Sequence, residues 1–181
     1  EEESEETTIF QSTRARIIAG GIAAAVCIGI FLFFMLQKSP DRKAYDEARK
    51  IDSVTAYRAY INVRPAGMYS GVVMFDIGKK YFHGEGVEKN EPAGREWFER
   101  SYTSLKAEAE QGMEEAFWRL GYLYYHGYGV SEDSARAKHW CERSAKAGYA
   151  DGQFLLGEIY CSGKGVLKDY SQAKYWYEKS A

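Results

Sequence analysis

A pattern that recurs three times after residue 70 constrains this chain more than any other feature. The copies are FDIGKKYFHGEGVEKNEPAGREWFERS, WRLGYLYYHGYGVSEDSARAKHWCERS and FLLGEIYCSGKGVLKDYSQAKYWYEKS. Their equivalent tryptophans, Trp97, Trp140 and Trp176, stand 43 and then 36 residues apart. Such a period is the signature of a repeat architecture, in which each unit stacks on its neighbours. We therefore expect three similar stacked units rather than one irregular domain.

Each unit has the pattern of two helices joined by a glycine-rich loop. In the second copy Ala116, Leu120 and Tyr124 share one face of a helix. The HGYGV segment that follows interrupts this helix, because glycines supply the backbone freedom of a tight loop. A residue that can cap a helix precedes the second helix of each copy: Asn90, Asp133 and Asp169.

The first copy has seven additional residues, which fall between Trp97 and Gly112 in a segment rich in helix formers. Seven residues are about two helical turns. We therefore expect a longer second helix that keeps the same face turned inward.

The pattern LG-x-LY-x-x-G-x-GV-x-x-D-x-x-x-A-x-x-W, from Leu120 to Trp140, resembles the Sel-one-like repeat, a variant of the tetratricopeptide repeat. The resemblance covers residues 72–181, as units of about 72–112, 113–148 and 149–181. It implies an all-α fold, a right-handed solenoid of antiparallel helix pairs, and a role in binding other proteins. The first copy departs from it at Val73 and Asn90. The family is not associated with one chemistry, so the fold implies no reaction.

Residues 37–71 form a linker and a capping helix in this interpretation. The segment 41–63 reads as one helix, which Pro65 and Gly67 end. It could cover the apolar edge of the first repeat, as the terminal units of solenoids must.

An apolar run of residues 17–36 follows an acidic tail of residues 1–16. As a helix this run would be about 30 Å long, which matches the hydrocarbon core of a bilayer. A cleaved signal peptide is disfavoured, because the run is long and no small-x-small cleavage site follows it. We expect a single-pass transmembrane helix in contact with the lipid bilayer.

Small residues recur on this run with a spacing that lets a second helix approach closely. They are Gly20, Gly21, Ala24, Ala25 and Gly29. The pattern favours helix–helix packing within the membrane. Ordinary glycine and alanine usage in membrane helices is the open alternative.

The balance of 24 basic and 26 acidic residues excludes an electrostatic nucleic-acid binder. More Lys and Arg flank the apolar run on its C-terminal side, which favours a cytoplasmic repeat domain. The family resemblance favours the extracytoplasmic side, because such repeats often lie beyond the bacterial inner membrane behind one anchor. We expect the inner membrane of a bacterium or a mitochondrion, with the repeats on the extracytoplasmic face.

No residue pattern indicates an enzyme, a cofactor, a metal site or a small-molecule substrate. His83 and His126 occupy equivalent loop positions, which favours packing over metal binding. The loop glycines lack the lysine and the preceding strand of a phosphate-binding loop.

Cys141 and Cys161 lie on helices expected to form an antiparallel hairpin about residue 150, at levels that differ by about one turn. One hypothesis is a disulfide between them, and the other is two buried free thiols.

Three positions in the first helix of each unit vary in chemistry while their neighbours stay apolar. Their spacing of i, i+3 and i+7 puts each trio on one helix face, and first helices line the concave surface of a solenoid. The trios are Asp76, Lys79 and His83; Arg119, Tyr122 and His126; and Leu155, Glu158 and Ser162. This surface is either a partner-binding face or a solvated one.

The sequence thus predicts a membrane-anchored protein–protein interaction scaffold, an accessory subunit or adaptor of a larger integral membrane complex. The alternative is an assembly or maturation factor, or an envelope regulator, that binds clients transiently. A third interpretation is a hydrolase or cell-wall-binding protein whose active part lies outside this chain.

Overall fold

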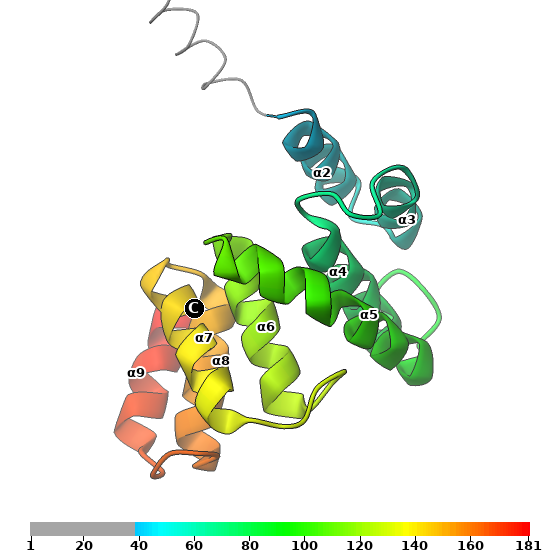
Figure 1. Ribbon diagram of the computed structural model, residues 1–181. Helices are drawn as coiled ribbons and strands as arrows, with labels where there is room; N and C mark the ends of the chain where they lie inside the picture. Colours follow the sequence, from blue (N-terminus) through cyan, green and yellow to red (C-terminus); the bar gives the residue numbers. More distant parts are fainter. Residues whose placement is uncertain (1–38) are drawn as a thin grey trace, which may run out of the picture. The chain divides into compact units, whose positions relative to one another are not determined.

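Helices make up the regular structure of residues 39–181, which are the residues that the computed structural model describes. In chain order they are α2 (Pro40–Ile51), α3 (Val54–Val63), α4 (Ser70–His83), α5 (Glu91–Glu110), α6 (Glu114–His126), α7 (Ser134–Lys146), α8 (Ala150–Ser162) and α9 (Tyr170–Ser180) (Figure 1). The predicted membrane helix of residues 17–36 and the acidic tail before it lie outside this range. Within residues 39–181, no helix combines the length and the apolar character needed to cross a bilayer.

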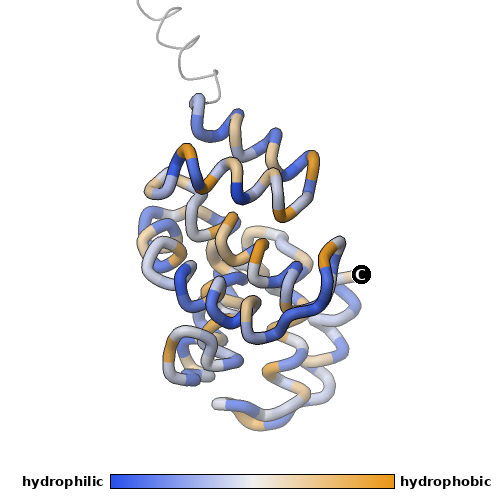
Figure 2. The backbone as a smooth tube through the Cα atoms, turned by 90° about the vertical axis from the view of Figure 1, so that its right-hand side faces the viewer, coloured by the Kyte–Doolittle hydropathy of each residue, from blue (hydrophilic) through white to orange (hydrophobic). Residues whose placement is uncertain are grey.

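The predicted all-α solenoid of three repeats is confirmed as three consecutive helical hairpins, α4–α5, α6–α7 and α8–α9 (Figure 1). Each hairpin packs on the next through α5 with α6 and α7 with α8. The first helices also touch directly, α4 with α6 and α6 with α8. Apolar residues recur at intervals along each helix rather than in long runs, as stacked amphipathic helices require (Figure 2).

The ends of the helices are where the sequence places them. The side chains of Asn90, Asp133 and Asp169 each accept a backbone hydrogen bond from the first turn of α5, α7 and α9, which confirms the three predicted caps. The first helices end at a left-handed glycine, for example Gly127 with φ 68°. A residue with a side chain would be strained in this conformation, so the HGYGV-type loops depend on glycine there.

The seven additional residues of the first repeat lengthen its second helix, as predicted: α5 has 20 residues, whereas α7 has 13. The extension carries Glu108, whose carboxylate accepts hydrogen bonds from the backbone N–H groups of Gly71 (2.6 Å) and Val72 (3.1 Å). Burial raises the pKa of Glu108 to about 7. Helix α4 has no side-chain hydrogen bond from its N-cap residue. The extension of α5 therefore satisfies backbone N–H groups in the first turn of α4 that would otherwise lack a partner.

The prediction of one helix over residues 41–63 is wrong, because the chain breaks between α2 and α3. Asp52 has a positive φ of 49°, and the Ser53 hydroxyl accepts a hydrogen bond from the N–H of Ala56. A serine that caps a new helix competes with continuation of the old one. Asp52 also forms a 3.0 Å ion pair with Lys80 of α4, which stabilises the break.

The two short helices cover the first repeat. Helix α3 packs on α4 and buries Tyr57 and Ile61. The ring of Tyr45 on α2 stacks on Tyr69 with centroids 4.3 Å apart. Apolar residues of the first hairpin that would otherwise face water are therefore shielded.

Candidate functional site

The first helices of the three repeats bring equivalent positions together on one face. Each first helix carries a glycine at the same position of the repeat, and an aromatic residue stands three residues before it: Phe75, Trp118 and Phe154. All three aromatic residues line a cavity of about 270 Å³. One residue after the same glycine stand Lys79, Tyr122 and Glu158, which line the same cavity. We call this cavity the aromatic groove.

The floor of the groove is aromatic. The ring of Phe75 meets Trp118 edge-on at 5.1 Å and Tyr122 at 5.5 Å between centroids. Phe75 and Trp118 are buried, whereas Phe154 is 52% exposed. The groove is therefore closed at its α4 and α6 side and offers an open ring on α8.

Opposite charges stand on the two sides of this floor. The Lys79 ammonium on α4 lies 6.0 Å from the centre of the Trp118 ring. On α8, Asp151 and Glu158 line the groove, and the Tyr177 hydroxyl donates a hydrogen bond to Glu158. Among residues 39–181, neither Lys79 nor Asp151 has an ion-pair partner, so both charges are available.

The two predicted histidines lie at the C-terminal end of the groove. The ring of His126 lies 4.3 Å from Tyr122 and stacks on Tyr128 at 5.3 Å. Burial lowers the pKa of His126, and the nearby Lys164 ammonium lowers it further. The His126 imidazole, packed on Tyr122 and Tyr128, therefore contributes an uncharged ring to the lining of the groove. In the part of the chain that the structure describes, no cluster of His, Cys, Asp or Glu could hold a metal.

The structure brings most of the nine predicted face residues together. Six of them line the aromatic groove: Lys79, His83, Tyr122, His126, Leu155 and Glu158. Ser162 lies beside it, where its hydroxyl accepts a 3.3 Å hydrogen bond from Tyr125.

The remaining two, Asp76 and Arg119, form an ion pair between α4 and α6. The guanidinium donates from Nε at 2.9 Å and from Nη2 at 3.0 Å to the two carboxylate oxygens of Asp76, and it also donates to the Glu115 carbonyl. Burial alone would lower the pKa of Arg119, but the Asp76 carboxylate raises it overall. These two side chains satisfy each other, so they hold two repeats together instead of facing a partner.

A second, polar cavity of about 380 Å³ adjoins the groove and shares Lys79, Trp118 and Asp151 with it. Its other charged side chains include the Asp76–Arg119 pair and the Asp52–Lys80 pair. The polar cavity also reaches Arg49 of α2 and Tyr57 of α3.

The sequence reasoning missed the aromatic floor, because it looked for positions that vary between repeats. Phe75, Trp118 and Phe154 are aromatic in all three copies. The signal that could have found them is an aromatic residue that directly precedes the first variable position in each copy.

Both Cys141 and Cys161 are free, which differs from the disulfide hypothesis. The Cys141 sulfur faces its own hairpin partner, 2.7 Å from where a Cβ on Gly121 would stand. Burial raises the pKa of the Cys141 thiol. The alternative of two buried thiols holds for Cys141 only, because Cys161 is half-buried.

Stacked helical hairpins with a groove across their first helices define a helical-repeat binding protein. The sequence profile described as Sel1 repeat matches residues 72–104, 115–149 and 150–181, and the chain therefore belongs to the Sel1 repeat family. Repeats of this family act as protein–protein interaction scaffolds and are generally non-catalytic.

Two solved structures illustrate the similarity. A Sel1 repeat protein from Oxalobacter formigenes is 29% identical, with a TM-score of 0.44, over 71% of this chain and 88% of that one. The protective antigen c5321 of uropathogenic Escherichia coli, which displays an SLR fold, is 28% identical, with a TM-score of 0.43. That match covers 70% of this chain but only 24% of the antigen. No curated protein matches the chain.

Proposed function

We propose that the chain binds a partner protein in the aromatic groove. The observation that supports this proposal is the lining of the groove, to which each of the three repeats contributes an aromatic ring. Lys79, Asp151 and Glu158 add charged groups to the same lining. An apolar ring that lines a cavity beside unpaired charges is typical of a binding surface.

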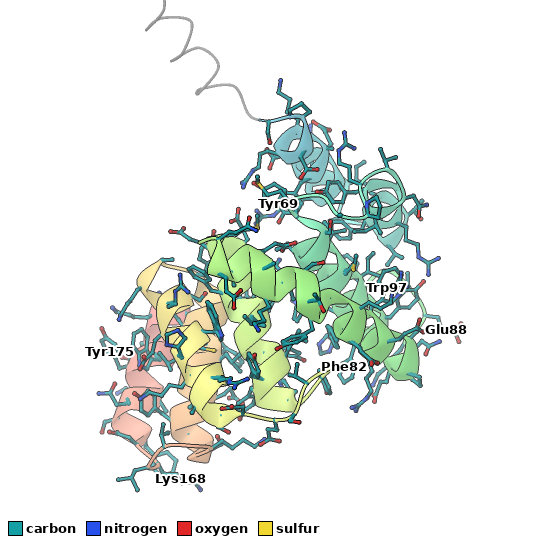
Figure 3. The ribbon with its side chains drawn as sticks, viewed as in Figure 1. Tyr69, Phe82, Glu88, Trp97, Lys168 and Tyr175 are labelled. Atoms are coloured by element: carbon teal, nitrogen blue, oxygen red, sulfur yellow. The ribbon has the colours of Figure 1, made fainter. Side chains whose placement is uncertain are left out.

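A photo-crosslinking residue in the groove tests this proposal. Tyr122 is replaced by a benzophenone amino acid in the full chain, expressed in its native host. Tyr175 is the matched control, because it is an exposed aromatic residue on α9 (44% exposed) outside the groove (Figure 3). A defined crosslinked protein from position 122, absent from position 175, is the expected result. Equal labelling from both positions, or none from position 122, would contradict the proposal.

We further propose that the apolar run of residues 17–36 anchors this scaffold in a membrane as an accessory subunit of a larger complex. Support comes from the length of the run and from its small-residue face, which includes Gly21 and Ala25. A helix that packs against a neighbouring subunit would hold the repeats at a fixed place on that complex.

Replacing Gly21 and Ala25 together by leucine tests the subunit role. The variant should stay in the membrane fraction but separate from its complex in mild detergent. A variant that still co-purifies would show that the run is only a tether. Protease accessibility of the repeats in intact spheroplasts or mitoplasts reports the side of the membrane, which we propose is extracytoplasmic.

A further inference from the structure

One structural position, repeated in each first helix, carries a positive, an aromatic and a negative side chain in turn. It is Lys79 on α4, Tyr122 on α6 and Glu158 on α8. Equivalent positions of stacked repeats lie side by side, and α4 touches α6 as α6 touches α8. The aromatic groove is therefore polarised across the repeats, from a basic wall through an aromatic floor to an acidic wall.

The charges on the two walls are available to a ligand. The Lys79 ammonium contacts the Trp118 ring but no carboxylate in residues 39–181. Asp151 adds a second carboxylate to the α8 wall. It attracts the Arg119 guanidinium at longer range but forms no direct ion pair within residues 39–181. In the adjoining polar cavity, by contrast, Asp76 and Asp52 are each paired with a basic residue.

The span of the aromatic groove favours a chain segment over a compact molecule. Its lining residues come from α4, α6 and α8, so a ligand that meets both walls must cross three helices. The groove continues into the polar cavity through shared residues. Packed helix axes lie about 8 to 10 Å apart, so a path from α4 over α6 to α8 needs about six extended residues.

We infer that the groove binds a linear segment of a partner protein that places an acidic side chain at Lys79, an apolar side chain on the aromatic floor, and a basic side chain at Asp151 and Glu158. This inference rests on the proposed function and specifies the partner's chemistry. The apolar anchor supplies most of the affinity, and the two charge pairs fix the direction in which the segment lies.

Four synthetic peptides with blocked ends test the inference by fluorescence anisotropy, using the full chain in mild detergent. Three have a central leucine flanked by acid and base, by two acids, or by two bases, and the fourth replaces the leucine of the first by serine. We expect the acid–leucine–base peptide to bind tighter than the peptide with two acids or the peptide with two bases, by about fivefold for the one ion pair gained in each comparison. The serine peptide should lose most of its binding, and so should the Phe154→Ala variant.

Charge reversal in the protein sharpens the test. Lys79→Glu makes both walls of the groove acidic, so this variant should bind the peptide with two bases most tightly. Asp151→Lys should move the preference toward the peptide with two acids. Lys168→Glu, the same charge change on the exposed loop before α9 (Figure 3), should leave the order unchanged. Circular dichroism confirms that each variant is folded.

The inference is overturned by equal binding of the three leucine peptides, by a preference that Lys79→Glu does not change, or by no binding at about 1 mM. These outcomes are separable from failure of the proposed function. A groove that crosslinks to a partner through position 122 but ignores peptide charge would retain the function and lose only its polarity.

Discussion

Replacing Asp76 by alanine should destabilise the repeat domain strongly, because it leaves a buried arginine without its counter-ion. Arg119 is 8% exposed and lies between α4 and α6. Its two hydrogen bonds to Asp76, at 2.9 and 3.0 Å, match the planar guanidinium to the two carboxylate oxygens. Its guanidinium carbon also lies 4.6 Å from the centre of the Trp118 ring.

The size of the effect follows from what remains after the substitution. Removing one partner of a buried ion pair costs about 3 to 5 kcal/mol. Arg119 keeps its hydrogen bond to the Glu115 carbonyl and its contact with Trp118, so we expect the lower end, about 3 kcal/mol. Replacing both partners, as Asp76→Leu with Arg119→Met, should cost less than about 1 kcal/mol, because no charge stays buried.

Urea unfolding of the full chain in mild detergent, followed by helical circular dichroism, measures these free energies. The matched control is Lys174→Ala, which removes the exposed 3.7 Å pair with Glu178 on α9. That change should cost less than about 0.5 kcal/mol. The reasoning fails if Asp76→Ala costs no more than the control, or if the double variant is as unstable as Asp76→Ala alone.

Three further predictions concern packing, titration and thiol chemistry. The folded state raises the pKa of Glu108 from 4.5 to about 7, so it binds a proton more tightly than the unfolded chain does. Stability should therefore fall as the pH rises from about 4.5 to 7, by at most about 3 kcal/mol, and Glu108→Gln should lack this slope in urea titrations. Gly94→Ala should lower the free energy of unfolding by about 1 to 3 kcal/mol in the same assay, because the new Cβ would stand 2.9 Å from the Gly78 carbonyl oxygen. Glu96→Ala, on the exposed face of the same helix, is the control. A thiol reagent should label Cys161 in the folded protein and Cys141 only after unfolding, and rapid native labelling of Cys141 would contradict its burial.

The repeat architecture could be predicted from the sequence because the features that define it act locally along the chain. A capping aspartate, a loop glycine and an apolar face at helical spacing act within a few residues of one another, so Asp133 and Gly127 have the same role in isolation as in the fold. The length of α5 followed from counting turns. The break at Asp52 had a local signal in the capping serine Ser53, which was overlooked. The ion pair of Asp52 with Lys80 that stabilises the break joins residues that only the fold brings together.

The candidate site was predicted in part for the same reason. Helical spacing correctly placed Lys79 and Tyr122 on one face. It did not reveal that Arg119 would turn toward Asp76, because that contact crosses between repeats. Phe154 was missed because its place in the groove depends on side chains of α4 and α6, which only the fold brings beside it.

Under the proposed function, selectivity would depend on the order of the repeats rather than on their composition. Residues 37–181 contain 22 basic and 21 acidic side chains, so no net field attracts a charged partner. A solenoid nevertheless places equivalent positions next to one another, and any position that differs between repeats therefore becomes a pattern in space. Lys79, Tyr122 and Glu158 turn a neutral composition into a surface with a direction. Exchanging Lys79 and Glu158 would keep the composition and reverse that direction, so a bound segment should lie the opposite way.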